Sequence, residues 1–172
     1  GDALNNGFRF VRQPMQEKRT LNLSPQETAA AGNMTVEENL RLFARLYGAD
    51  KAAAKLAARR TAEKMGLADR LGEKAKKLSG GLCKRLSIGM ALVSSPETVF
   101  LDEPTLGLDV RARQALRALL KGLEKDGLTI VLTTHYLEEA EQLADRIGIL
   151  DKGRLLAEGS AASFKTLAGA ET

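Results

Sequence analysis

The pattern of apolar and polar positions divides the chain into three stretches. Residues 8–11 and 21–23 alternate apolar with polar side chains, which is typical of half-buried strands. Residues 35–93 carry apolar side chains at helical spacing, and after Pro96 short apolar runs alternate with amphipathic stretches. We therefore expect a small β region, an all-helical block and a βαβαβ series, in that order.

The helical block is predicted to contain three helices. The first begins at Thr35, because its hydroxyl and the Glu38 carboxylate can cap each other's backbone N–H groups. Its packing face is formed by four apolar side chains: Val36, Leu40, Phe43 and Tyr47. Asp50 predicts a second helix that runs to Met65, and a third lies around Leu86.

The βαβαβ series predicts strands at residues 98–101, 130–132 and 147–150, in a mostly parallel sheet buried on both faces. The first crossover helix would bury four leucines: Leu116, Leu119, Leu120 and Leu123. Residues 151–153 have the composition of a turn, so residues 154–158 are expected to return as an antiparallel edge strand.

Composition favours one ordinary globular domain. The 172 residues are 44% apolar and 28% charged, and the net charge of +4 is too small for a dedicated nucleic-acid binder. No run approaches the ~20 apolar residues that a membrane-spanning helix needs. Cys83 is the single cysteine, which fits a reducing cytosol.

Candidate chemistry follows two of the predicted strands. Asp102 and Glu103 end the first strand, where one carboxylate could hold Mg²⁺ and the other could activate a water for attack on a phosphate. Thr133 and Thr134 end the second strand and are followed by His135, at the same predicted sheet edge. The alternatives are two solvated acids and a structural histidine.

Leu78-Ser79-Gly80-Gly81 opens the third predicted helix, where free backbone N–H groups and the helix dipole attract anions. The glycines would let a phosphate approach the backbone. The alternative is a flexible turn with a serine cap.

The order and spacing of these motifs resemble the nucleotide-binding domain of ATP-binding cassette (ABC) proteins over almost the entire chain. Residues 78–81 resemble the signature motif, residues 98–103 the Walker B strand with its catalytic glutamate, and residues 107–109 the D-loop. His135 lies at the switch-histidine position, and Gln26 is similar to the Q-loop glutamine.

The resemblance implies a P-loop NTPase-like α/β fold with an inserted helical subdomain. It divides the chain into a β region with the Q-loop (1–34), a helical subdomain (35–93) and an α/β core (94–172). Gly-x-x-x-x-Gly-Lys-Ser/Thr, the Walker A phosphate loop, occurs nowhere in the 172 residues. We therefore expect the Walker A loop, its strand and the first helix to precede residue 1, and residues 1–172 alone neither to bind ATP tightly nor to hydrolyse it.

The resemblance also implies roles for individual residues. Those implied in catalysis are Glu103, His135 and Gln26. Those implied in binding ATP are Ser79, Gly80, Gly81 and Asp109. Those implied in binding Mg²⁺ are Asp102 and Gln26. Two positions depart from the usual pattern, Leu82 after the signature glycines and Val110 after the D-loop aspartate, and neither would carry the chemistry.

The implied function is ATP hydrolysis coupled to export through a separate membrane permease, at the cytoplasmic face of the membrane. Residues 34–40 and 134–141 are similar to exporters of drugs, lipids, sodium or peptides. The implied partners are the permease and a second nucleotide-binding domain, without nucleic acid. Two alternatives stay open: a non-catalytic truncated cassette, and a non-transport cassette protein that acts on nucleic acid or the ribosome.

Overall fold

The computed structural model describes residues 4–5, 8–9 and 20–164. The chain divides into two compact units, residues 1–133 and 134–172. In the first, β1 (Leu4–Asn5) and β2 (Phe8–Arg9) form a short antiparallel pair. The predicted continuation of the second strand through residues 10 and 11 lies outside the described residues.

Helix α2 (Val36–Leu46) begins as the sequence predicts. The Thr35 hydroxyl accepts a hydrogen bond from the Glu38 N–H at 3.1 Å, and the Glu38 carboxylate accepts one from the Thr35 N–H at 2.7 Å. These hydrogen bonds lower the pKa of the Glu38 carboxyl, because they favour its charged form. Two orphan backbone donors at the start of the helix are thus satisfied.

The packing face of α2 differs in part from the prediction. Val36 and Leu40 are fully buried, but Tyr47 is 40% exposed. Tyr47 is the C-cap residue, and the buried positions of α2 end at Ala44. Placing Tyr47 in the core was therefore wrong, because a helical stripe is buried only as far as a neighbouring element covers it.

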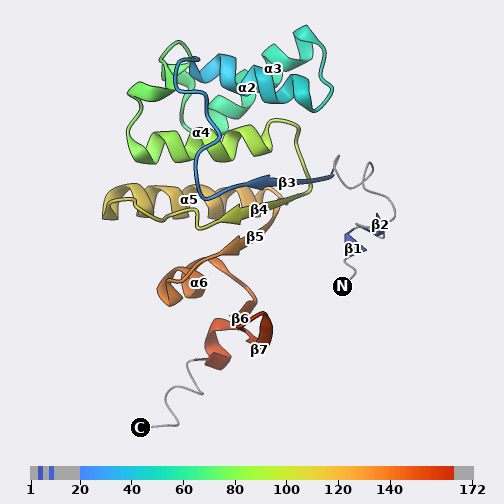
Figure 1. Ribbon diagram of the computed structural model, residues 1–172, viewed down its shortest axis with the longest axis vertical. Helices are drawn as coiled ribbons and strands as arrows, with labels where there is room; N and C mark the ends of the chain where they lie inside the picture. The colour runs from blue at the N-terminus through green and yellow to red at the C-terminus, as the bar shows by residue number, and fades with distance from the viewer. Residues whose placement is uncertain (1–3, 6–7, 10–19, 165–172) are drawn as a thin grey trace. The chain divides into compact units, whose positions relative to one another are not determined.

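Helix α3 (Lys51–Lys64) is capped by Asp50, whose carboxylate accepts a hydrogen bond from the Ala53 N–H at 2.8 Å. Two short 3₁₀ turns, η1 (Ala68–Arg70) and η2 (Ala75–Lys77), lead to α4 (Gly80–Leu92). Figure 1 shows α4 lying beneath α2 and α3, and it packs against both of them and against β3 and α5. No helix in the described ranges is long and apolar enough to cross a membrane.

Three parallel strands form the sheet of the first unit, in the order β3 (Leu21–Ser24), β4 (Thr98–Asp102) and β5 (Thr129–Thr133). Helix α5 (Val110–Lys125) connects β4 to β5 and buries Leu116, Leu120 and Leu123. The predicted burial on both faces holds only for β4. β3 and β5 are the edges of the three strands, so their side chains are partly exposed.

The second unit contains α6 (Leu137–Leu143), β6 (Ile147–Asp151) and β7 (Arg154–Gly159). The predicted turn and antiparallel return are confirmed, because β6 pairs with β7 around Lys152 and Gly153, which both have positive φ. The sequence places β6 in the parallel sheet, whereas the structure pairs it with β7 in a separate two-stranded sheet. The tight turn makes the following strand the nearest hydrogen-bonding partner.

Candidate functional site

The two carboxylates lie where β4 ends, and a threonine of the neighbouring strand positions both residues. The Thr133 hydroxyl donates to the Asp102 carboxylate at 2.6 Å and accepts from the Glu103 N–H at 3.1 Å. Asp102 and Thr133 are also directly paired in the parallel sheet. Sequence reasoning placed Thr133 at the end of the next strand but gave it no role in the site, although that position is a usable signal.

Glu103 has an unusual backbone conformation. Its φ is 44°, in the left-handed region that residues with a Cβ seldom adopt. The turn that follows is closed by a hydrogen bond from the Leu106 N–H to the Glu103 carbonyl at 3.2 Å. The chain therefore leaves the strand direction at Glu103, and strain of this kind gathers at functional sites.

The signature residues lie at the N-terminus of α4. Ser79 is the N-cap, and its hydroxyl accepts a hydrogen bond from the Leu82 N–H at 3.5 Å. Ser79 and Gly80 are exposed. The serine cap weighed as the alternative is thus present, and it leaves the exposed helix start available to an anion.

A second helix N-terminus lies beside the first. Asp109 caps α5 by accepting a hydrogen bond from the Ala112 N–H at 2.8 Å. A Cβ added to Gly81 would come within 2.9 Å of the Ala112 Cβ, so the two helix starts are in close contact. The structure therefore brings together the two helix starts that carry the predicted ATP-binding residues Gly81 and Asp109, and with them the positive dipole ends of both helices.

Gln26 lies in the loop after β3 and is exposed, but its main chain is held by a hydrogen bond. The Lys84 ammonium on α4 donates to the Gln26 carbonyl at 2.9 Å. Burial lowers the pKa of Lys84 from its ordinary value, and the nearby charges of Asp102 and Glu103 oppose that shift. Sequence reasoning also missed Lys84, whose signal was a lysine, with Arg85 beside it, on a helix otherwise made of apolar and small residues.

His135 belongs to the second unit, where it is exposed and its ring centroid lies 4.1 Å from that of Tyr136. Its predicted place at the same edge as Glu103 stays a prediction.

The carboxylates have the donor chemistry that Mg²⁺ prefers. The described residues contain no group of three or more His, Cys, Asp or Glu side chains able to hold a metal. Mg²⁺ commonly uses one or two protein carboxylates and completes its octahedron with water and substrate phosphate oxygens. Asp102 and Glu103 fit that kind of site, and the paired helix N-termini fit a phosphate.

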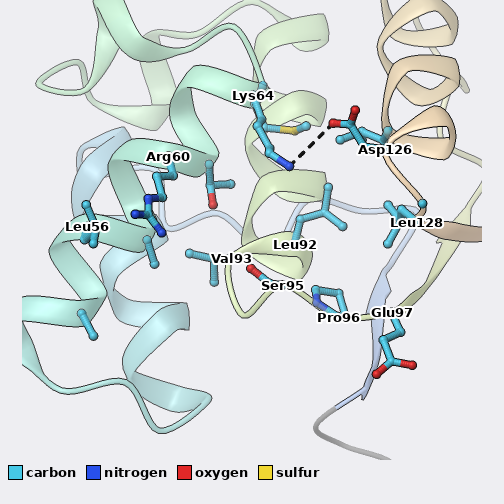
Figure 2. Close-up of a pocket in the computed structure, with 16 residues that line it drawn as sticks. Leu56, Arg60, Lys64, Leu92, Val93, Ser95, Pro96, Glu97, Asp126 and Leu128 are labelled. Carbon is cyan, nitrogen blue, oxygen red and sulfur yellow. Dashed lines mark ion pairs between the residues drawn. The ribbon is translucent and has the colours of Figure 1, made fainter.

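A cavity of about 600 Å³ lies elsewhere in the first unit, between α3, the end of α4 and the end of α5. Figure 2 shows Leu92 and Val93 on its wall and the ion pair between Lys64 and Asp126 on one side of it. None of the predicted site residues lines it. The cavity and the candidate chemistry are therefore separate features of this unit.

Known proteins resemble the chain over nearly all of its length. A family described as ABC transporter matches residues 2–106. The linearmycin resistance ATP-binding protein LnrL of Bacillus subtilis is 35% identical over 172 residues, which are 100% of this chain and 55% of LnrL. The doxorubicin resistance ATP-binding protein DrrA of Mycobacterium tuberculosis is 40% identical over 169 residues, which are 98% of this chain and 51% of DrrA.

A solved structure described as the ATP binding subunit of an ABC transporter shares the fold. It superimposes with a TM-score of 0.76 at 30% identity, over 95% of this chain and 68% of the solved chain. The chain thus spans about half the length of the two bacterial resistance proteins and somewhat more of the solved subunit.

Proposed function

The chain belongs to the ABC transporter family, and we propose that it is the part of an ATP-hydrolysing subunit that carries the signature motif, the Walker B carboxylates and the switch histidine. The observation that carries the proposal is the carboxylate pair. Thr133 fixes Asp102 and Glu103 at the carboxyl edge of a parallel sheet, where α/β proteins bind ligands.

The carboxylates divide the work of phosphoryl transfer between them. Glu103 would take a proton from the water that attacks the γ-phosphate, and Asp102 would supply a ligand to Mg²⁺ with support from Gln26. Bound Mg²⁺ would supply positive charge that stabilises the phosphate oxygens in the transition state. Thr133 keeps the Asp102 carboxylate oriented, because its hydroxyl donates to one of the two oxygens.

The phosphate-binding role falls to the two helix N-termini. Ser79, Gly80 and Gly81 would donate to the γ-phosphate of an ATP held by a second nucleotide-binding domain, with Asp109 beside them at the start of α5. His135 would contact the γ-phosphate of bound ATP.

The transport role concerns the full-length protein. LnrL and DrrA are named for resistance to linearmycin and doxorubicin. Their similarity supports outward transport, through a separate permease, by a protein held at the cytoplasmic face of the membrane. Closure of two nucleotide-binding domains around ATP would drive that permease.

Replacing the proposed base tests this function. In the full-length protein, Glu103→Gln keeps the size of the side chain and removes the base, so we expect ATP turnover to fall by about 10²–10⁴-fold while ATP affinity changes little. Turnover is followed by phosphate release, and affinity by equilibrium binding of a labelled nucleotide.

The matched control is Glu63→Gln, which makes the same change at an exposed position of α3 and should leave turnover unchanged. Undiminished turnover in Glu103→Gln would exclude Glu103 as the base. A full-length wild-type protein that binds ATP without hydrolysing it would instead favour the non-catalytic cassette.

A further inference from the structure

A row of polar contacts joins α4 to β3 and the loop that follows it. We call this row the α4 seam, and its contacts are Asn22 Nδ2 to Ala91 O and to Ser94 Oγ, Ser24 Oγ to Ser87 Oγ, Lys84 Nζ to Pro25 O and Gln26 O, and Cys83 Sγ to Thr28 Oγ1. As the strand and loop proceed from residue 22 to 28, their partners step back from Ser94, just beyond the end of α4, to Cys83 near its start. The loop therefore runs antiparallel along one face of α4.

Lys84 is the charged member of the α4 seam. Its residue is only 8% exposed, and its ammonium lies 2.9 Å from the Gln26 carbonyl and 3.5 Å from the Pro25 carbonyl. A buried ammonium is expensive unless hydrogen bonds and opposite charges compensate it. The two carbonyls supply hydrogen-bond acceptors, and Asp102 and Glu103 supply opposite charge.

The position of Lys84 links three parts of the proposed site. It belongs to the helix whose N-cap is Ser79, it holds the main chain of Gln26, and it lies within the electrostatic reach of the Walker B carboxylates. Lys84 contacts the backbone carbonyl of Gln26 and not its side chain. The side-chain amide of this exposed residue can therefore bind a ligand.

We propose that Lys84 is a positioning residue for ATP hydrolysis, because its ammonium ties the loop of Gln26 to the signature helix and makes the two move as one body. The proposal rests on the proposed function for its catalytic consequence. The tie between loop and helix is a property of the chain itself and is measured separately.

The first measurement uses the lone cysteine as a reporter of the loop. Cys83 Sγ lies 3.7 Å from Thr28 Oγ1, so Thr28→Cys places a second thiol beside the first. Oxidised glutathione is the oxidant, and it is reduced to two molecules of glutathione as the two thiols join. In the 172-residue chain with Thr28→Cys, adding Lys84→Met should slow this disulfide formation at least about tenfold, since a hydrogen bond from a charged donor is lost. Lys84 is next to Cys83 in the sequence, so its replacement can change the reactivity of the Cys83 thiol itself. Each cross-linking rate is therefore divided by the rate at which Cys83 reacts with a small disulfide reagent in the matching protein that keeps Thr28.

Three further variants complete the comparison. Lys84→Arg keeps the charge and should retain most of the cross-linking rate. Lys55→Met makes the same change at an exposed position of α3 and should leave the rate unchanged. Thermal unfolding shows whether each variant folds. If Lys84→Met does not fold, Lys84→Gln replaces it, and the same tenfold slowing of the cross-link is expected.

The second measurement is turnover of the full-length protein. Lys84→Met should lower kcat at least about tenfold while KM for ATP stays within about twofold, because Gln26 acts on the water and metal rather than on nucleotide affinity. Lys84→Arg should recover part of that kcat.

The outcomes separate the two proposals. A normalised cross-linking rate that Lys84→Met leaves unchanged overturns the tie, whatever the turnover. A slowed cross-link with full turnover overturns the role in hydrolysis. A slowed cross-link in a protein whose wild type hydrolyses no ATP confirms the tie and contradicts the proposed function.

Discussion

Helices α3 and α4 have nearly the same length, 14 and 13 residues, but they are buried very differently. α3 buries one stripe of small residues, Ala54, Ala58, Thr61 and Ala62, and turns lysines and arginines outward. α4 buries every residue from 86 to 91, because α2, α3, β3, β4 and α5 pack around it. The helix that carries the signature motif is thus the packing centre of the first unit, while α3 is a one-sided cover.

The same leucine-to-alanine change on each helix should give the largest contrast. Leu86 on α4 is fully buried, and Leu56 on α3 is 51% exposed. Leu86→Ala should lower the free energy of unfolding by about 2–5 kcal/mol, because it loses buried area and leaves a cavity. Leu56→Ala should change it by less than about 0.5 kcal/mol. Urea unfolding of both variants measures the difference, and equal losses would contradict the contrast between the helices.

A glycine at the start of α4 gives the next contrast. A Cβ at Gly81 would meet the Ala112 Cβ at 2.9 Å, so Gly81→Ala should destabilise the chain by about 1–3 kcal/mol through overpacking. Gly122 on α5 has nothing within 4 Å of an added Cβ, so Gly122→Ala should stabilise it by about 0.4–1 kcal/mol.

Pairing Gly81→Ala with Ala112→Gly checks the cause of that loss. The second change removes the opposing Cβ, so the double variant should lose less stability than the sum of the two single variants. Additive losses in urea unfolding would mean that the two helix starts are not in close contact.

Local chemistry explains which parts of this structure could be predicted from the sequence. The cap at Thr35 and the two-residue turn at Lys152 depend on neighbours a few residues away, and both are confirmed. The strand ends at Asp102 and Thr133 were predicted within one or two residues, because apolar β-rich runs mark parallel strands.

What could not be predicted depends on contacts between distant segments. Lys84 donates to the carbonyl of Gln26, which lies 58 residues away in the sequence. The exposure of Tyr47 and the partial exposure of β5 could not be predicted either. The sequence pattern shows which face of an element is apolar, but it does not show how much of that face a neighbouring element covers. The contact between the start of α4 and the start of α5 likewise could not be predicted, because it depends on the approach of Gly81 to Ala112 in the folded chain.

The smallest effect is expected at an ion pair that joins α3 to the turn after α5. Lys64 Nζ lies 3.8 Å from Asp126 Oδ2, with side chains 62% and 65% exposed, so water screens most of their attraction. Lys64→Met should therefore change the free energy of unfolding by less than about 0.5 kcal/mol, with little dependence on salt. Urea unfolding at low and high salt measures both quantities, and Lys55→Met, an exposed lysine of the same helix, is the control. A loss above about 1 kcal/mol that disappears at high salt would show that α3 is held to the end of α5 electrostatically, which a one-sided cover packed through alanines does not need.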